Sequence, residues 1–153
     1  MDAAAHVDIR ITQRFDAPAD HVFNAWLDPG FAGRWLFATA TRPVPRVKID
    51  ARAGGSFRFE DRRYGKTVVQ AGRYLEIARP RRIAFTLSGS RRPARNGAAH
   101  VSVEIAPIGK GCELTLLHQR VRPDEAERIE GRWAGMLYGL ATILGPSGPK
   151  DEG

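Results

Sequence analysis

The stretch from Asp124 to Leu144 constrains the fold of this chain more than any other, because it predicts one long amphipathic helix. Asp124 and Glu125 place negative charge at its start, where the helix dipole favours it. Gly145 and Pro146 supply the usual stop. Between these signals, apolar residues at spacings of three and four form one stripe: Ala126, Ile129, Trp133, Met136, Leu137, Leu140, Ile143 and Leu144. A stripe this wide needs a large apolar surface to cover it.

The chain before this helix alternates apolar and polar residues in a pattern that predicts seven β-strands. The predicted strands are Val7–Phe15, Val44–Ala51, Ser56–Tyr64, Lys66–Ile77, Ile83–Leu87, Val101–Ile105 and Leu114–His118. The last two are expected to pair across a turn. In the fourth, Val69, Ala71, Leu75 and Ile77 share one parity, and Gly72 indicates a bulge or a close approach.

Two short helical segments are predicted between the first and second strands. One begins within Asp16–Asp20, has Val22, Phe23, Trp26 and Leu27 on one face, and ends at Asp28-Pro29-Gly30. The other, Phe31–Phe37, is helical or turn-like.

Consecutive strands imply an antiparallel meander, and helices segregated from the strands imply an α+β fold. We therefore expect a curved antiparallel sheet of about seven strands around the long C-terminal helix. A chain of 153 residues is expected to form a single domain over residues 1–153, structured over about 7–145. A disordered tail is expected over 146–153.

Composition narrows the class of protein. No stretch approaches the roughly 20 apolar residues of a membrane span, and the N-terminus lacks the pattern of a secretory signal. The single Cys112 excludes an internal disulfide, so a cytoplasmic location is expected.

Despite the net charge of +7, arginines cluster only at Arg79–Arg82 and Arg91–Arg95, so we expect no nucleic-acid partner. The four histidines share no ligand spacing, so no metal is expected. Gly54-Gly55 is too short and wrongly placed for a phosphate-cradling loop, and no cofactor is expected.

A series of short motifs lies in order along about 130 residues. They are Arg14–Pro18, Val22–Trp26 with Asp28-Pro29, Trp35, Asp50–Phe57, Gly72–Ile77 with Pro80 and Arg82-Ile83, Cys112–His118, and Gly131–Trp133 with Leu137 and Leu140. This series resembles the helix-grip fold of the START-like (SRPBCC) superfamily, in the branch related to the activator of the heat-shock protein 90 ATPase. The resemblance implies a cavity under the long helix, in which members of the superfamily bind lipids, sterols, polyketides and other apolar molecules.

Eleven residues are expected to line such a cavity: Trp35, Phe37, Phe57, Phe59, Phe85, Leu116, His118, Trp133, Met136, Leu137 and Leu140. Trp26 and Tyr138 are further aromatic residues expected to line or plug it.

His118 is the one candidate for catalysis, as an acid or base, because counting by two from Leu114 and Leu116 directs it inward. The alternative is a structural hydrogen bond from its imidazole to a backbone carbonyl. Gln13 is a second inward polar candidate. Strand parity identifies no inward carboxylate.

Three functions stay open at this point. The first is the binding of a small hydrophobic ligand of lipid, polyketide or aromatic type. The second is a cyclase- or hydrolase-like activity that uses His118. The sequence identifies no set of polar residues that converges with His118 on one site, which argues against an enzyme. The third is a stand-alone co-chaperone-type interaction domain, although the chain has no room for the second domain of the eukaryotic activators, so no chaperone partner is expected. A homodimer formed through an exposed edge strand is also left open.

Overall fold

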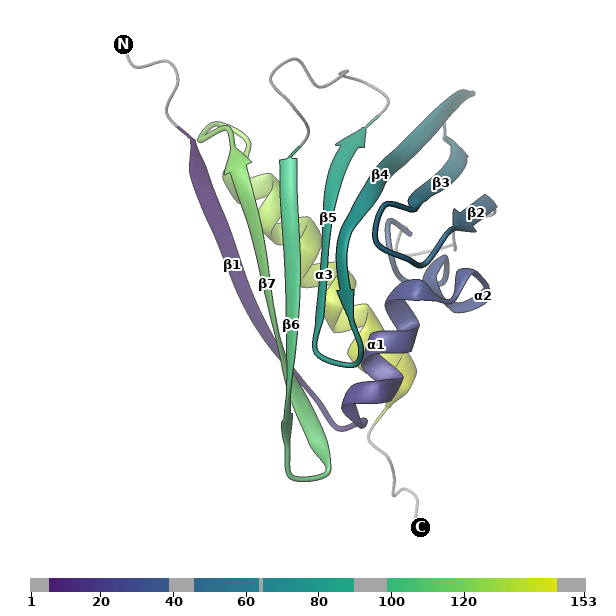
Figure 1. Cartoon of the computed structure of the whole chain (residues 1–153). Helices are drawn as coiled ribbons and strands as arrows, with labels where there is room; N and C mark the ends of the chain where they lie inside the picture. The colour runs from purple at the N-terminus through teal and green to yellow at the C-terminus, as the bar shows by residue number, and fades with distance from the viewer. Residues whose placement is uncertain (1–5, 39–45, 64, 90–98, 146–153) are drawn as a thin grey trace.

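The structure is a computed structural model that describes residues 6–38, 46–63, 65–89 and 99–145. Seven strands form one antiparallel sheet in the order β1-β7-β6-β5-β4-β3-β2 (Figure 1). The strands are β1 Val7–Phe15, β2 Arg46–Ile49, β3 Ser56–Arg63, β4 Lys66–Ala78, β5 Arg82–Gly89, β6 Ala99–Ile108 and β7 Gly111–Val121. The helices are α1 Ala19–Leu27, α2 Pro29–Ala32 and α3 Ala126–Leu144. The predicted α+β helix-grip architecture is confirmed.

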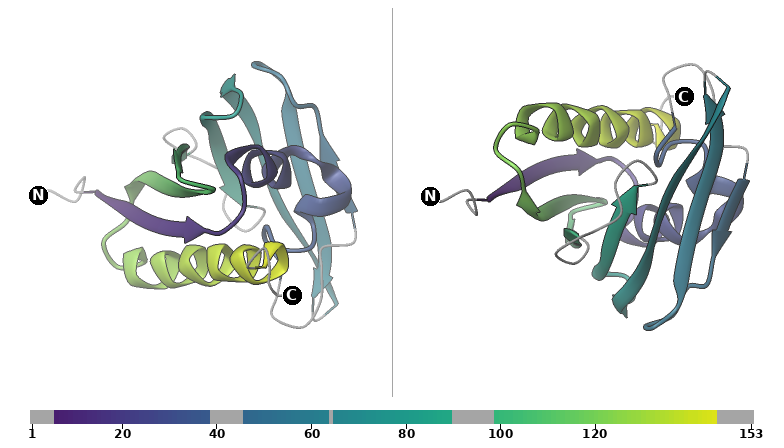
Figure 2. Two further views of the ribbon diagram at one scale, coloured as in Figure 1. Left: turned by 90° about the horizontal axis from the view of Figure 1, so that it is seen from below. Right: turned by 90° about the horizontal axis from the view of Figure 1, so that it is seen from above.

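The sheet is strongly curved, and all three helices lie on its concave side (Figure 2). α3 runs alongside β1, while α1 and α2 lie between α3 and the β2–β4 end of the sheet. The buried apolar residues of the strands and helices therefore meet in one core. Among the described residues, no helix has both the length and the hydropathy to cross a membrane.

The pairing of β6 with β7 follows the predicted alternation. Val101 lies opposite His118, Val103 opposite Leu116, and Ile105 opposite Leu114. Five of these side chains are at most 2% exposed and His118 is 6% exposed, so both strands turn the same face to the core. The inward direction of His118 is thereby confirmed.

Strand β4 departs from the predicted parity. A register shift between Tyr74 and Glu76 places Tyr74 in the core, while Leu75 is 47% exposed. Ala71 pairs with the exposed Arg58 and so lies on the outer face. Only Ile77 of the four apolar residues predicted to share a face packs against the core, because the bulge reverses the alternation within the strand. Gly72 is the predicted close approach, since an added Cβ would collide with the Thr86 carbonyl oxygen and the Phe57 ring.

Several predicted boundaries shift by a few residues. α3 begins at Ala126 rather than Asp124, β2 covers only part of the predicted strand, and the second short segment is α2 followed by a turn to Phe37. The ends of the second and third predicted strands at Val44 and Tyr64, and the expected tail over 146–153, lie outside the described residues.

Candidate functional site

The eleven residues predicted to line a cavity come together between the sheet and the helices; we call this set the interior site. Ten of them are buried, and the eleventh, Met136, is partly buried and packs against the same core. Strands β3, β5 and β7 supply one wall and α3 supplies the opposite wall, because each element turns its apolar face inward. Trp35 and Phe37 come from the turn after α2.

Aromatic rings in mutual contact fill the middle of the interior site. Trp26 on α1 packs edge-on against Trp35 at 4.8 Å between ring centroids, and lies 6.2 Å from Trp133 and 6.3 Å from Phe85. Phe37 extends the group, with its ring 6.0 Å from Trp133. We call these five residues the aromatic cluster. Ring pairs at such distances attract one another beyond the effect of burial alone.

His118 forms a buried hydrogen bond to α3. The indole Nε1 of Trp133 donates to His118 Nδ1 at 2.9 Å. Burial lowers the pKa of His118 to about 4, so the imidazole is neutral at neutral pH. A neutral imidazole that accepts through Nδ1 carries its proton on Nε2. The structural alternative of a bond to a backbone carbonyl is thus replaced by a bond between two side chains.

The three tryptophans differ in how their indole N–H groups are satisfied. Trp133 donates to His118, and Trp35 Nε1 donates to the Ala25 carbonyl oxygen at 3.0 Å. Trp26 Nε1 is buried and has no hydrogen-bond partner among the described residues. An unpartnered buried donor is costly, so it calls for a physical explanation.

Phe37 and Met136 close one side of the interior site. The backbone N–H of Phe37 donates to the Met136 sulfur at 3.0 Å, which joins the turn after α2 to α3. Phe37 has φ 61°, in the left-handed region that a phenylalanine rarely adopts. A thioether is a weak acceptor on a flexible side chain. The hydrogen bond between Phe37 and Met136 is therefore weak.

Asp61 and Tyr138 differ from the sequence-based interpretation, whereas Gln13 lies on the inward parity that was predicted, opposite the buried Leu114. Asp61 on β3 is 4% exposed, so the expectation of no inward carboxylate is wrong. Its parity with Phe57 and Phe59 was the signal that would have identified it. Tyr138 is 69% exposed and does not contribute to the interior site. Gln13 is half-buried on β1, and its amide donates to the neighbouring Arg14 carbonyl oxygen at 3.0 Å.

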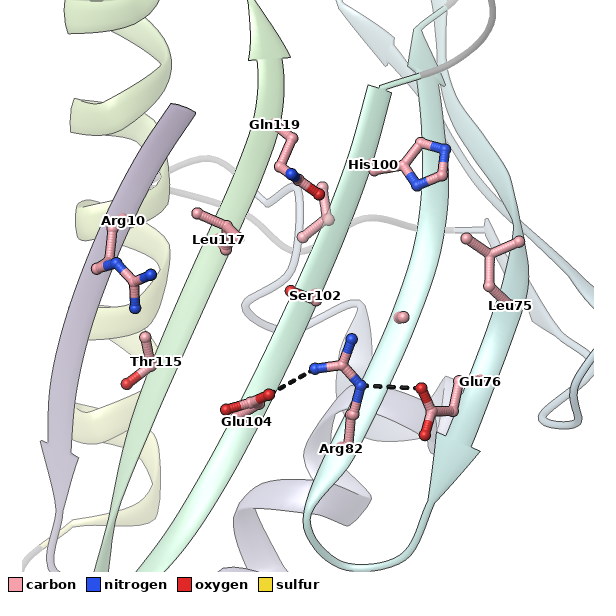
Figure 3. Close-up of a pocket in the computed structure, with 12 residues that line it drawn as sticks. Arg10, Leu75, Glu76, Arg82, His100, Ser102, Glu104, Thr115, Leu117 and Gln119 are labelled. Carbon is pink, nitrogen blue, oxygen red and sulfur yellow. Dashed lines mark hydrogen bonds and ion pairs between the residues drawn. The ribbon is translucent and has the colours of Figure 1, made fainter. Parts of the chain in front are cut away.

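A polar depression lies on the outer face of the sheet, across the sheet from α3 (Figure 3). Its volume is about 410 Å³, and it crosses β1, β4, β5, β6 and β7. Arg82 occupies its centre and bonds to Glu76 at 2.9 Å and Glu104 at 2.6 Å. With Arg10, which also lines the depression, two positive and two negative side chains balance there. The alternation of the strands gave no sign of a hollow there.

Among the described residues, no group of three or more His, Cys, Asp or Glu side chains could hold a metal ion.

Comparison with known proteins assigns the family. The family model described as "Activator of Hsp90 ATPase homolog 1-like protein" matches residues 16–145. The chain belongs to this family. The match takes in α1 and α3 and therefore every residue of the interior site and of the aromatic cluster. A search of curated protein sequences gave no match.

Solved structures with the same architecture as this AHSA1-type chain come from several bacteria. Protein CV1439 from Chromobacterium violaceum is 27% identical, with a TM-score of 0.75 over 90% of this chain and 96% of that one. CalU16 from Micromonospora echinospora is 25% identical, with a TM-score of 0.69 over 95% and 81%. The Aha1 dimer from Colwellia psychrerythraea is 14% identical, with a TM-score of 0.74 over 93% and 99%, a likeness of fold alone.

Proposed function

We propose that this AHSA1-type domain binds one small, largely apolar molecule between its sheet and α3. The observation that carries the proposal is the composition of the interior site, where aromatic and aliphatic side chains from two walls surround a few neutral polar groups. Binding sites for small organic molecules have this composition. The apolar lining would supply the affinity, and the polar groups would orient the ligand.

Entry of a ligand requires that the packed rings separate, and we place this opening at the Phe37–Met136 contact. The hydrogen bond there is to a weak acceptor, and Phe37 holds a left-handed backbone conformation that costs free energy. Met136 can then change rotamer, since its side chain is unbranched and only partly buried. The ligand would enter past Phe37 and Met136 and occupy the space that opens between the rings of the aromatic cluster.

The geometry of His118 favours binding over catalysis. An acid–base catalyst at neutral pH needs a pKa near 7, whereas burial lowers the pKa of His118 to about 4. Its Nδ1 already accepts from Trp133. A role in holding Trp133 in place agrees better with these contacts than proton transfer does.

Two measurements test the proposal. Native mass spectrometry of the purified protein, before and after denaturation, should reveal a discrete bound mass that is lost on unfolding. Titration with N-phenyl-1-naphthylamine, a neutral apolar dye, should saturate at about one dye per chain.

The variant Met136→Lys places an ammonium group in the apolar wall and should weaken dye binding by tenfold or more, because burying that charge is costly. The matched control is Tyr138→Lys, two residues along the same helix at an exposed position, which should bind the dye as the unmodified chain does. Equal loss in both variants, or dye uptake that does not saturate in folded protein, would contradict the proposal.

A further inference from the structure

We infer that the ligand carries a neutral hydrogen-bond acceptor, such as the carbonyl oxygen of an aryl ketone, ester or quinone, which accepts a hydrogen bond from Trp26 Nε1. This inference rests on the proposed function and adds to it the chemical class of the ligand and the residue that recognises it.

Trp26 carries a fully buried side-chain donor that has no hydrogen-bond partner among the described residues. Its side chain is 2% exposed, and its Nε1 has no partner among the described residues and no contact with solvent. The rings of Trp35 and Trp133 both pack against Trp26, and the Nε1 of each has a hydrogen-bond acceptor. Among the three indole N–H groups, the missing partner is therefore particular to Trp26.

The ring contacts of Trp26 place it beside the ligand proposed above. Its ring contacts Trp35, Phe85 and Trp133, three residues of the interior site from three different elements. A molecule that separates these rings must touch Trp26. An indole N–H only donates, so the complementary group must be an acceptor.

The surroundings also specify a neutral acceptor. None of the aromatic cluster or the interior site carries a cation, and His118 is uncharged at neutral pH. An ionised carboxylate or phosphate in this apolar setting would lack a counter-charge, and its burial would be costly. A carbonyl oxygen completes the hydrogen bonding of Trp26 without adding charge. The flat aromatic lining favours an aromatic carbonyl compound, since offset or edge-on ring contacts then form on several sides.

The test compares probes that differ only in the acceptor. Each pair is an aryl methyl ketone and its isopropenyl analogue, in which a CH₂ group replaces the carbonyl oxygen without a large change of shape; acetophenone, 2-acetylnaphthalene and 2-acetylanthracene cover three sizes. Binding to the unmodified chain is measured by competition with N-phenyl-1-naphthylamine. For the pair that fits, the ketone should bind about tenfold more tightly than the alkene. This ratio of dissociation constants corresponds to the net free energy of one hydrogen bond in a site without water.

Two variants assign this difference to one atom. In Trp26→Phe the ketone and the alkene should bind equally well, because the donor is gone. In Trp35→Phe, which removes a neighbouring indole whose N–H is already satisfied, the tenfold preference for the ketone should persist. The indole N–H resonance of Trp26 in the unmodified chain provides a readout that needs no variant: the ketone should shift it downfield more than the alkene does.

The outcomes separate the two proposals. If both members of a pair bind the unmodified chain equally, or if the ketone preference survives in Trp26→Phe, the role of Trp26 is wrong while the proposed function stands. If neither member of any pair binds to the folded protein and native mass spectrometry shows no bound mass, the proposed function fails and this inference fails with it.

Discussion

At the scale of single residues, the hydrogen bond between Trp133 and His118 links the sheet to α3 inside an apolar core. It satisfies the indole N–H of one residue and fixes the tautomer of the other. Because the imidazole is buried and uncharged, its protonation would break this bond and leave a charge without a counter-ion. The stability of the fold should therefore depend on this histidine.

We expect His118 to make folding stability fall at acid pH. The pKa is about 4 in the folded chain and 6.5 for an unperturbed histidine, so between these values the unfolded chain binds more protons. The contribution is fully present above pH 6.5, decreases as the pH falls, and is lost below pH 4, a change of about 3 kcal/mol. Urea unfolding from pH 4 to 7.5 measures it.

The variant His118→Gln keeps an oxygen that can accept from Trp133 but does not titrate, so its stability should change less over that pH range. His100→Gln, at an exposed position on the outer face, is the control and should keep the full pH dependence. NMR of the folded chain should show the proton on Nε2 at pH 7. A His118 imidazole that titrates near pH 6.5 in the folded protein would refute the assignment.

Residue-scale features were predictable from the sequence only in part. Alternation along β7 was enough to direct His118 inward, because the side-chain period of a strand is fixed. Its partner was not predictable, since Trp133 lies on a helix whose rotation against the sheet depends on tertiary packing. The missing hydrogen bond of Trp26 Nε1 was not predictable for the same reason, because the sequence shows that a donor exists but not whether an acceptor reaches it.

At the scale of secondary-structure elements, β4 shows how a single bulge changes the two faces of a sheet. The strand is 13 residues long, and its pairing with β5 shifts between Tyr74 and Glu76. Strand existence was predictable from apolar alternation and from turn glycines such as Gly54 and Gly65, both of which have positive φ. Gly72 indicated a bulge or a close approach, but the position of the bulge was not predictable, because an extra residue leaves the local composition unchanged while it reverses the parity of the residues after it.

Gly72 in β4 should not tolerate a side chain. In Gly72→Ala the added Cβ would meet the Thr86 carbonyl oxygen and lie 2.7 Å from Cζ of Phe57, and backbone atoms cannot move away by a change of rotamer. We expect a loss of about 1–3 kcal/mol or more in the free energy of unfolding, measured with urea.

The control for Gly72→Ala is Gly131→Ala in α3, where an added Cβ has open space. Replacing a helical glycine at such a position should raise stability by about 0.5–1 kcal/mol. A Gly72→Ala variant as stable as the unmodified chain would mean that β3, β4 and β5 pack less closely in solution than these contacts require.

At the scale of the whole molecule, one face of the sheet packs against the core and the other carries charged side chains that form ion pairs. The concave face packs against all three helices, whereas Arg82 joins Glu76 and Glu104 across β4, β5 and β6 on the opposite face. The order of elements and the ordered series of motifs were sufficient to predict this architecture. They could not predict how much space remains in the core, because that depends on how closely the aromatic rings pack.

The asymmetry between the two faces leads to a prediction about two leucines of the sheet. Leu116 on β7 faces the helices and is 0% exposed, whereas Leu75 on β4 lies on the outer face and is 47% exposed. Leu116→Ala should cost about 2–5 kcal/mol, since it removes buried methyl groups and leaves a cavity. Leu75→Ala should change stability by no more than about 0.5 kcal/mol, because its side chain already contacts water. Urea midpoints at constant m-value distinguish the two, and an equal loss would show that a further layer covers the outer face in solution, as a homodimer formed through that face would do.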